Sequence, residues 1–593
     1  MERDFLNVAR SVTGRRWRAR LDDTRTAEAI SQQHDLPDIL GRVLAARGVG
    51  VDGAEAFLTP TLRALMPQPS ALRDMEKGAA RLADAVMAAE KIGVISDYDV
   101  DGVASAAMLQ LFLRAVGSDA AVHIPDRITE GYGPSERAVA MLKGQGASLL
   151  VTLDCGVMAH APLAHAAELG LAAIIVDHHR AGEVLPEAHA VINPNRQDDL
   201  SGFGYLCAAG VTMIFVAAVN KLLRQRGWYS STRPEPNMLR WLELVALATG
   251  CDVVPLVGLN RAYVTQGLKI MARRENPGLA ALADMARLKR RPDCYALGFM
   301  LGPRLNAAGR IGSAALALQL LTTTDRGEAN RLAQELERLN RERQAIEMRV
   351  VDQAVIQAEQ ALGREGRAAV LVVSGEGWHP GVAGLAASRL KERFGLPALV
   401  LAHDKGGLLA SGSGRSIIGV DLGGAVLAAH AAGIIVKGGG HAMAAGLTVE
   451  LGRLADLRVF LDGHLAAQVA AAADPSLAID GALTASGASL DLIELLEQAG
   501  PYGSGHPAPV FAFPAHRVVY ADKAGSDHIR LSLASADGKR IKAIAFRSIG
   551  TELGELLLSE RQFPLHIAGR LTIDDWGTTR VPSVHIEDVA RIS

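Results

Sequence analysis

Three aspartates stand at alternate positions in the sequence, Asp97, Asp99 and Asp101, directly after an apolar run at residues 92–95. In an extended segment, side chains two residues apart point to the same side. Carboxylates this close repel one another unless a cation lies among them. A solvated acidic turn accounts for a lone D-x-D-x-D segment equally well, so this segment by itself leaves both a metal site and a surface turn open.

Two further apolar runs end in residues of the same kind. One run leads into Asp154, and a later one leads into Asp177, His178 and His179. Helical stretches separate the runs, an alternation that is typical of a parallel sheet wound with helices. Ligands bind such sheets at the carboxyl ends of the strands. We therefore expect all these aspartate and histidine side chains to converge at one edge of the sheet.

Asp252 follows a helical region at roughly residues 205–250. Gly250 is expected to stop that helix just before Asp252. Taken alone, Asp252 is a capping residue. Beside a convergent acidic site it becomes a candidate metal ligand.

A site rich in carboxylates, with one or two histidines and no thiolate, suits Mn²⁺ best and Mg²⁺ next, and suits Zn²⁺ less. Four or five acidic groups exceed what one ion needs, whereas two ions about 3.5–4 Å apart with a shared carboxylate would use them well. Such a pair activates water and stabilises in-line displacement at phosphorus. His178 and His179 are adjacent and point in different directions, so one can bind a metal while the other donates to a phosphate. For an isolated pair, a capping or core role would be the better interpretation.

Composition limits the classes of protein and partner. The chain has 593 residues, 49% of them hydrophobic, which is enough for about three to five domains. Its net charge of −2 predicts that any contact with nucleic acid is confined to a local groove. The four cysteines form no C-x-x-C pair, no apolar run is long enough for a bilayer, and the start lacks a signal-peptide core. We expect a cytoplasmic protein that does not bind a membrane.

The expected fold class is a multidomain α/β protein with a terminal β-barrel. A connector helix is predicted from the absence of Gly and Pro between Gly327 and Gly363, and it would span roughly 50–60 Å. Short alternating segments near the C-terminus predict a barrel of the oligonucleotide-binding (OB) kind. The expected divisions are a helical segment at 1–70, a catalytic parallel-sheet domain at 71–324, the connector helix at 325–365, a second α/β domain at 366–470 and the barrel at 471–593.

Several segments outside the acidic cluster carry basic residues. The stretch from Gly14 to Arg20, with Trp17, is interpreted as a solvated face rather than a contact to phosphate. Residues 301–311 are predicted to form a loop, and the glycine-rich stretches at 408–417 and 436–446 are predicted to form loops that bind phosphate, although ordinary tight turns would explain the glycines too. A strand-tracking surface on the barrel is predicted from Arg530, Arg540, Lys542, Phe546 and Trp576.

Four segments, D-Y-D-V-D-G, L-D-C-G, V-D-H-H and C-D-V-V-P-L, resemble the motifs of the DHH phosphoesterase superfamily. The later segments R-L-N-A-A-G-R, G-W-H-P-G-V-A-G, G-S-G-R-S, G-G-G-H-A-M-A-A-G and P-Y-G-S-G-H-P resemble its RecJ branch, including the DHHA1 domain. The resemblance covers nearly the whole chain after about residue 70. It implies a single-strand-specific exonuclease that degrades DNA from the 5′ end, releases mononucleotides, acts in recombination and repair and uses Mn²⁺ or Mg²⁺. It also implies a single-strand-binding protein and a RecQ-type helicase as partners.

The resemblance also implies a role for individual residues. Asp99 and Asp154 would hold one metal, with Asp97 near it. The second metal would be held by Asp101, Asp154, His178 and Asp252, with Asp154 bridging, and His179 would contact the scissile phosphate. The 5′-terminal phosphate would be held by Arg127, Ser413 and Arg415. The path of the strand would be lined by Arg304, Asn306, Arg310, His379 and His441.

Two departures from the family pattern stand out. The segment before V-V-P-L reads A-T-G-C-D where the family often has G-T-V-A-D, which places Cys251 beside the expected ligand. The terminal β-domain is poor in aromatic residues.

Two alternatives are a phosphodiesterase for short oligonucleotides or cyclic dinucleotides and a non-catalytic DNA-binding scaffold. The connector and the barrel argue against the first, and the intact acidic set argues against the second.

Overall fold

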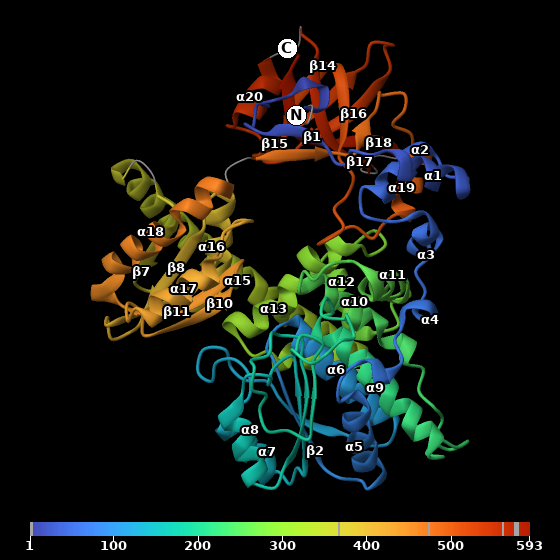
Figure 1. Ribbon diagram of the computed structural model, residues 1–593, viewed down its shortest axis with the longest axis vertical. Coiled ribbons are helices and arrows are strands. Elements are labelled where there is room, and N and C mark those ends of the chain that lie inside the picture. Colours follow the sequence, from blue (N-terminus) through green and yellow to red (C-terminus); the bar gives the residue numbers. More distant parts are fainter. Residues whose placement is uncertain (1–3, 366–367, 473–474, 560–562, 575–579, 593) are drawn as a thin grey trace. The chain divides into compact units, whose positions relative to one another are not determined.

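The computed structural model describes residues 4–365, 368–472, 475–559, 563–574 and 580–592 (Figure 1). The chain divides into two compact units. The larger unit is Leu65–Ala473, and the smaller unit combines Met1–Ala64 with Asp474–Ser593. Each unit is described by itself.

The larger unit begins with a five-stranded, wholly parallel sheet in the order β3-β2-β4-β5-β6. Its strands are β2 (Ile92–Ser96), β3 (Ala120–His123), β4 (Leu149–Leu153), β5 (Ala172–Val176) and β6 (Ala190–Ile192). Every residue of β2 and β4 is buried. This confirms the predicted parallel sheet and adds β6, which the sequence analysis did not predict.

Helices cover both faces of this sheet. α7 (Glu136–Gly144) and α8 (His160–Glu168) lie on one face, and α5 (Met75–Met87), α6 (Val100–Ala115) and α9 (Ala208–Gln225) lie on the other (Figure 1). Leu142 of α7 and Leu163 of α8 pack in one apolar cluster with Leu150 and Ile175 of the sheet. The apolar runs between the motifs therefore form the core that fixes where each strand ends.

A layer of helices follows α9. Its members are α10 (Leu242–Cys251), α11 (Gly258–Met271), α12 (Pro277–Met285), η5 (Ala296–Leu301), α13 (Gly302–Ile311) and α14 (Ala315–Thr322). Two predictions are wrong here. Gly250 does not stop α10, which continues to Cys251 and is capped by Asp252. Residues 301–311 form helix rather than a loop: η5 runs directly into α13, so Pro303 follows a π-helical turn, whose hydrogen-bond pattern differs from that of an α-helix.

α15 (Arg326–Glu365) is one uninterrupted helix of 40 residues. At 1.5 Å per residue it spans about 60 Å. Along its length it packs on α12, α13 and α14, and it also packs on α16 (Pro380–Phe394) and β7 (Leu371–Gly375). The predicted connector helix is confirmed.

The second sheet has the order β10-β11-β9-β8-β7. Its other strands are β8 (Ala398–His403), β9 (Leu409–Arg415), β10 (Lys437–His441) and β11 (Ala444–Glu450), and α17 (Leu422–Ala431) and α18 (Leu454–Ala472) share its apolar core. The two glycine-rich stretches were predicted as loops, but they form β9, β10 and β11. Glycine is required by packing, since a Cβ on Gly412 would lie 1.9 Å from the carbonyl oxygen of Val400.

The smaller unit contains a closed five-stranded barrel. Its strands are β14 (Phe511–Ala524), β15 (His528–Ala534), β16 (Arg540–Ala545), β17 (Leu565–Asp574) and β18 (Val581–Arg591), with α20 (Glu552–Ser559) between β16 and β17. The pairing of β14 with both β15 and β17 closes the ring. The predicted OB-like barrel is confirmed.

The first residues of the chain belong to this barrel unit. β1 (Arg16–Ala19) pairs in parallel with β12 (Ser476–Ile479), and α1 (Arg25–Gln33) and α2 (Asp38–Ala45) follow it. Ile30 of α1 and Leu40 of α2 join the core of the barrel. The N-terminal segment is therefore not purely helical, because a strand precedes its helices.

The basic stretch from Gly14 to Arg20 is not a solvated face, so that interpretation is wrong. Trp17 is 0% exposed, and its Nε1 donates to Asp588 at 2.9 Å. Arg15 lies 3.4 Å from the same carboxylate, and Arg20 lies 3.1 Å from Asp480. Carboxylates far away in sequence hold these cations inside the unit.

The expected strand-tracking surface on the barrel is partly neutralised. Arg530 pairs with Asp522 at 3.0 Å, and Lys542 pairs with Asp574 at 2.8 Å. Phe546 is exposed and makes edge contacts to His528 and His585. Arg540 is exposed as well, whereas Trp576 lies outside the described residues.

None of the described helices combines the length and the apolar character that a bilayer span requires.

Asp588→Ala should destabilise the smaller unit by about 2–4 kcal/mol, because a buried acceptor of three donors is lost. Those donors are Nε1 of Trp17, Oγ1 of Thr13 and the amide of Val589, and the Arg15 guanidinium lies 3.4 Å from the same carboxylate. Urea unfolding checks this. Asp522→Ala, at an exposed pair of the same barrel, is the control and should change nothing measurable. An equal loss in both variants would contradict the buried role of Asp588.

Glu243 of α10 predicts a pH-dependent stability. It is 4% exposed, and burial first, then the charge of Glu275, raises its pKa from 4.5 to about 7. The unfolded chain releases this proton at lower pH than the folded chain. Folding is therefore weakened progressively as the pH rises from 4.5 towards 7. As the pH rises from about 5 to about 8, the free energy of unfolding of Glu243→Gln should increase by about 2 kcal/mol relative to that of the wild type. Urea unfolding at each pH measures this difference. Parallel pH profiles for the two proteins would contradict this.

Candidate metal centre and phosphate pocket

The loop after β2 places the first carboxylates at the edge of the parallel sheet. Asp97 directly follows the strand, and Asp99 is the N-cap of α6, where its Oδ1 accepts from the amides of Asp101 (2.9 Å) and Gly102 (3.2 Å). A Cβ on Gly102 would lie 2.5 Å from the carbonyl oxygen of Asp97, so only glycine fits there. The capping role and the ligand role of Asp99 are compatible, because its other oxygen takes no part in the cap.

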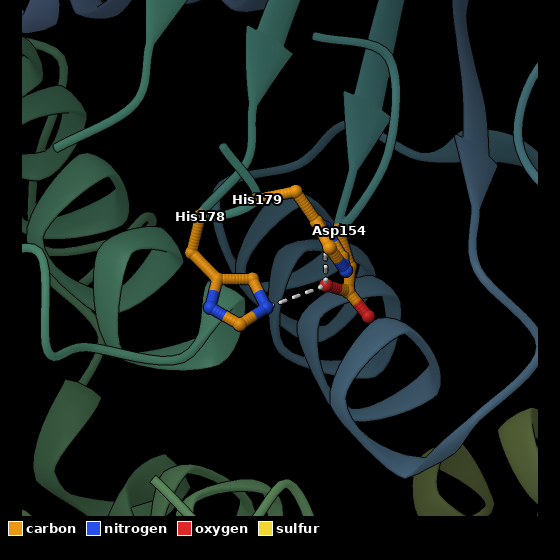
Figure 2. A group of neighbouring side chains, drawn as sticks. All are labelled: Asp154, His178 and His179. Carbon is orange, nitrogen blue, oxygen red and sulfur yellow. Dashed lines mark ion pairs between the residues drawn. The ribbon is translucent and has the colours of Figure 1, made fainter. Parts of the chain in front are cut away.

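Asp154 directly follows β4 at the same edge, beside the two histidines that follow β5 (Figure 2). Its φ of +60° lies in the left-handed region that few non-glycine residues adopt. In the described part of the chain, the Oδ1 atoms of Asp97 and Asp154 are buried and accept no hydrogen bond. Buried acceptors without a donor are costly, and a bound cation would satisfy them.

His178 turns one ring nitrogen towards three carboxylates. Its Nδ1 donates to the carbonyl oxygen of Leu206 at 3.1 Å. Its Nε2 faces Asp154 at 3.3 Å, Asp101 at 3.7 Å and Asp252 at 3.8 Å. With Nδ1 bound to a backbone carbonyl, Nε2 is the ring nitrogen available to a metal ion, as is usual for histidine ligands.

Asp177 acts behind the histidines rather than among the ligands. Its buried carboxylate accepts from the amides of Val157, His178 and His179 and from Nδ1 of His179 at 2.8 Å. Burial alone would lower the pKa of His179, but the hydrogen bond and the charge of Asp177 raise it to about 9. His179 is thus oriented with its Nε2–H free to donate.

Two more carboxylates complete the cluster. Asp101 accepts from the amides of Ala208 (2.7 Å) and Ala209 (2.8 Å) at the start of α9, where the helix dipole favours a negative charge. Asp252 is the C-cap of α10. The end of one helix and the start of another therefore bring both carboxylates to His178.

The ligand atoms form three overlapping groups, each with all its atoms within 4.8 Å of one another. The groups are Asp97, Asp99 and Asp154; Asp101, His178 and Asp252; and Asp154, His178 and His179. The first two lie next to each other through the contact of His178 with Asp154. All atoms are carboxylate oxygens or imidazole nitrogens, a donor set that suits Mn²⁺ or Mg²⁺.

The electrostatics of the cluster point the same way. Burial first, and then the neighbouring carboxylates, raise the pKa of Asp154 well above its ordinary value. The same causes raise the pKa of Asp97 and of Asp101, and bring that of Asp252 to about 9. The ionised form of this cluster therefore needs compensating positive charge, and the residues present fit divalent cations.

A cavity of about 600 Å³ in the same unit contains part of the expected phosphate site. Arg127, Ser413 and Lys437 are among its lining residues, and the Arg127 guanidinium lies 5.0 Å from the ring centre of Tyr98. Burial first, then the nearby Arg127, Arg343 and Arg415, lower the pKa of Arg310 to about 10. An excess of buried positive charge of this kind suits an anion.

The other residues expected to line the path of the strand do not all lie together. Arg310 donates to the carbonyl oxygen of Gly381 at 3.0 Å, and His379 caps α16 by accepting from the Gly381 amide at 3.1 Å. His441 is exposed at the end of β10. Arg304 and Asn306 are engaged elsewhere.

Arg304 and Asn306 make internal contacts in place of lining the cavity. Arg304 pairs with Glu337 at 2.7 Å, and Oδ1 of Asn306 accepts from the Val100 amide at 3.2 Å. Sequence reasoning also missed two residues of the site, Tyr98 and Tyr132. Tyr98 stands inside the D-Y-D segment and Tyr132 inside G-Y-G, next to residues that were singled out.

Comparison with known proteins identifies the family. The profile of the DHH family, N-terminal domain, matches residues 91–249, that of the DHHA1 domain matches 365–467, and that of the RecJ OB domain matches 479–588. The chain is 35% identical over 570 residues to the single-stranded-DNA-specific exonuclease RecJ of Salmonella typhimurium, covering 94% of this chain and 96% of the relative. It is 36% identical over 517 residues to the protein of that name from Escherichia coli, covering 85% and 88%.

Solved structures agree with the sequence relatives. RecJ from Thermus thermophilus in complex with Mn²⁺ matches with a TM-score of 0.79 at 27% identity, over 96% of this chain and 78% of that one. The same protein in complex with Mg²⁺ matches with a TM-score of 0.72 at 25% identity, over 96% and 77%. The chain therefore belongs to the RecJ family of single-stranded-DNA-specific exonucleases.

Proposed function

We propose that this chain is a 5′-to-3′ exonuclease specific for single-stranded DNA, which hydrolyses phosphodiester bonds with two divalent ions, Mn²⁺ or Mg²⁺, and releases 5′-mononucleotides. The observation that carries the proposal is the pair of adjacent ligand groups that meet where His178 contacts Asp154. The names of its RecJ relatives and their complexes with Mn²⁺ and Mg²⁺ support it.

The proposed ligands of one ion are Asp99 and Asp154, with Asp97 beside them. Those of the other ion are Asp101, His178, Asp252 and the shared Asp154. When bound, the two ions supply Lewis-acid activation of water and charge compensation at the phosphate. Asp177 holds Nδ1 of His179 and raises the pKa of the ring, and Nε2 is the nitrogen available to donate to the scissile phosphate.

Polarity is proposed to come from the positive cavity. Arg127, Ser413 and Arg415 would hold the 5′-terminal phosphate, with Arg310 adding charge from behind. His379 and His441 are proposed to border the path of the strand. Arg304 and Asn306 are proposed to line this path, and each also makes an internal contact.

Wider context follows from family membership. We propose a single-strand-binding protein and a RecQ-type helicase as partners, a role in DNA recombination and repair, and a cytoplasmic location. The four cysteines are free in the structure, which supports a reducing compartment.

The division of the chain into functional domains is likewise a proposal. Catalysis is assigned to 71–324 and the second α/β domain to 366–470, joined by the connector at 325–365. The barrel at 471–593 is proposed to bind DNA. The segment at 1–70 is kept as a separate N-terminal division, although most of it belongs to the same compact unit as the barrel.

The polarity can be tested with single strands labelled at either end. With Mn²⁺, the 5′ label should appear early as a mononucleotide, whereas the 3′ label should stay on long products, because the anchored end is the 5′ phosphate. EDTA should abolish both signals. Early release of the 3′ label would contradict the polarity, and equal cleavage of a blunt duplex would contradict the strand specificity.

Asp154→Asn should lower kcat about a thousandfold or more, because the shared ligand of both ions is lost. Calorimetric titration with Mn²⁺ should show weaker binding in the absence of DNA. Asp421→Asn, at the exposed N-cap of α17, is the matched control and should keep activity and Mn²⁺ affinity. Retained turnover in Asp154→Asn would remove the bridging role.

A further inference from the structure

A compact turn lies between the phosphate cavity and the metal centre. The carboxylate of Asp126 accepts from the amides of Ile128 (2.9 Å) and Thr129 (2.8 Å), and its carbonyl oxygen accepts from the amides of Glu130 (2.8 Å) and Gly131 (3.0 Å). Glu130 in turn accepts from the Asp126 amide at 3.1 Å. These bonds tie residues 126–131 into one small body, so a displacement at one end of the turn is passed to the other.

One end of the turn belongs to the phosphate cavity. Arg127 lines it and lies over the ring of Tyr98 at 5.0 Å. Tyr98 stands between Asp97 and Asp99 in the chain. The guanidinium proposed to meet the end of the strand therefore rests on the segment that carries the metal ligands.

The other end of the turn reaches the metal centre through Tyr132. Its hydroxyl donates to the carbonyl oxygen of Asp154 at 3.0 Å and lies 3.1 Å from Nδ1 of His179. The Tyr132 ring meets the His179 ring edge-on, with centres 5.6 Å apart. Although the side chain is 51% exposed, its polar end is turned inward onto two residues of the site.

The contact with Asp154 falls on an unusual backbone. The φ of Asp154 is +60°, a conformation that a non-glycine residue keeps only where its surroundings hold it. The Asp154 amide donates to the carbonyl oxygen of Val176, and its own carbonyl oxygen accepts from Tyr132. The strand thus holds the peptide group before Asp154, and Tyr132 holds the peptide group after it.

We propose that Tyr132 is a positioning residue, which fixes the backbone of Asp154 and the ring of His179, and that the turn at 126–131 links the strand end bound at Arg127 to the metal centre. This inference rests on the proposed function for its DNA part only. Its metal part depends solely on the geometry around Asp154.

Tyr132→Phe tests the proposal, because it keeps the ring contact with His179 and removes only the hydroxyl. Mn²⁺ binding, measured by calorimetry without DNA, should weaken about tenfold, as is usual when a group behind a metal ligand is lost. With a 5′-phosphorylated strand, kcat should fall by about 10- to 100-fold while KM stays within about threefold. A simple loss of folded protein would lower kcat without changing Mn²⁺ affinity.

Tyr229→Phe is the matched control. Its hydroxyl donates to Oδ1 of Asn220, in the same unit, and touches no residue of the site. It should leave Mn²⁺ affinity, kcat and KM unchanged. Wild-type values in Tyr132→Phe, or equal losses in both variants, would overturn the positioning role. If the wild-type chain binds Mn²⁺ but does not degrade single strands, the proposed function fails while the titration still decides the role of Tyr132.

The link through the turn is tested with strands that end in a 5′ phosphate or a 5′ hydroxyl. In the wild type, the phosphate should raise kcat as well as lower KM. In Tyr132→Phe, the advantage in kcat should fall towards one, and the advantage in KM should remain, because Arg127 is untouched. An unchanged advantage in kcat in the variant, or none in the wild type, would overturn the link.

Discussion

Mutual repulsion among buried carboxylates is the constraint on which the larger unit depends. The fold compensates this repulsion with backbone amides: Asp99 caps the start of α6, Asp101 accepts from the first two amides of α9, and three amides donate to Asp177. The negative charge that these amides do not compensate is concentrated at Asp97 and Asp154, each with a buried oxygen that accepts no hydrogen bond from the described residues. The folded chain therefore compensates most of the carboxylate charge itself, and a pair of cations would compensate the rest.

The cavity beside the metal centre shows the opposite imbalance. Arginines gather there, and burial, together with their mutual repulsion, lowers the pKa of Arg310 and of Arg415. Tyr98 is the point where the two clusters meet, with carboxylates on either side of it in the chain and the Arg127 guanidinium over its ring. The clusters affect each other, since Arg127 lowers the pKa of Asp97 and Asp99 raises that of Arg310, but burial outweighs both effects.

Much of the site could be predicted because parallel strands end at one edge, so Asp97, Asp154 and His178 had to meet once the sheet was recognised. That Asp177 supports the histidines while the neighbouring aspartates are candidate ligands could not be predicted, since this depends on the direction in which each side chain points. Trp17 and Asp588 could not be paired either, because they lie 571 residues apart in sequence. The glycines of β9 to β11 resemble those of a turn in sequence, and only the close approach of Val400 to Gly412 shows that packing requires them.

Helix α13 contacts both the loop that carries the metal ligands and the start of α16. Asn306 accepts from the amide of Val100, beside the aspartates, and one turn later Arg310 donates to Gly381 at the start of α16. Gly309 lies between them, where a Cβ would come within 2.5 Å of the carbonyl oxygen of Tyr98. Through these contacts one helix joins the loop that carries the metal ligands to the start of α16, where Pro380 lines the cavity. The spacing between the carboxylates and the cavity therefore depends on backbone contacts as well as on the polar side chains of the motif.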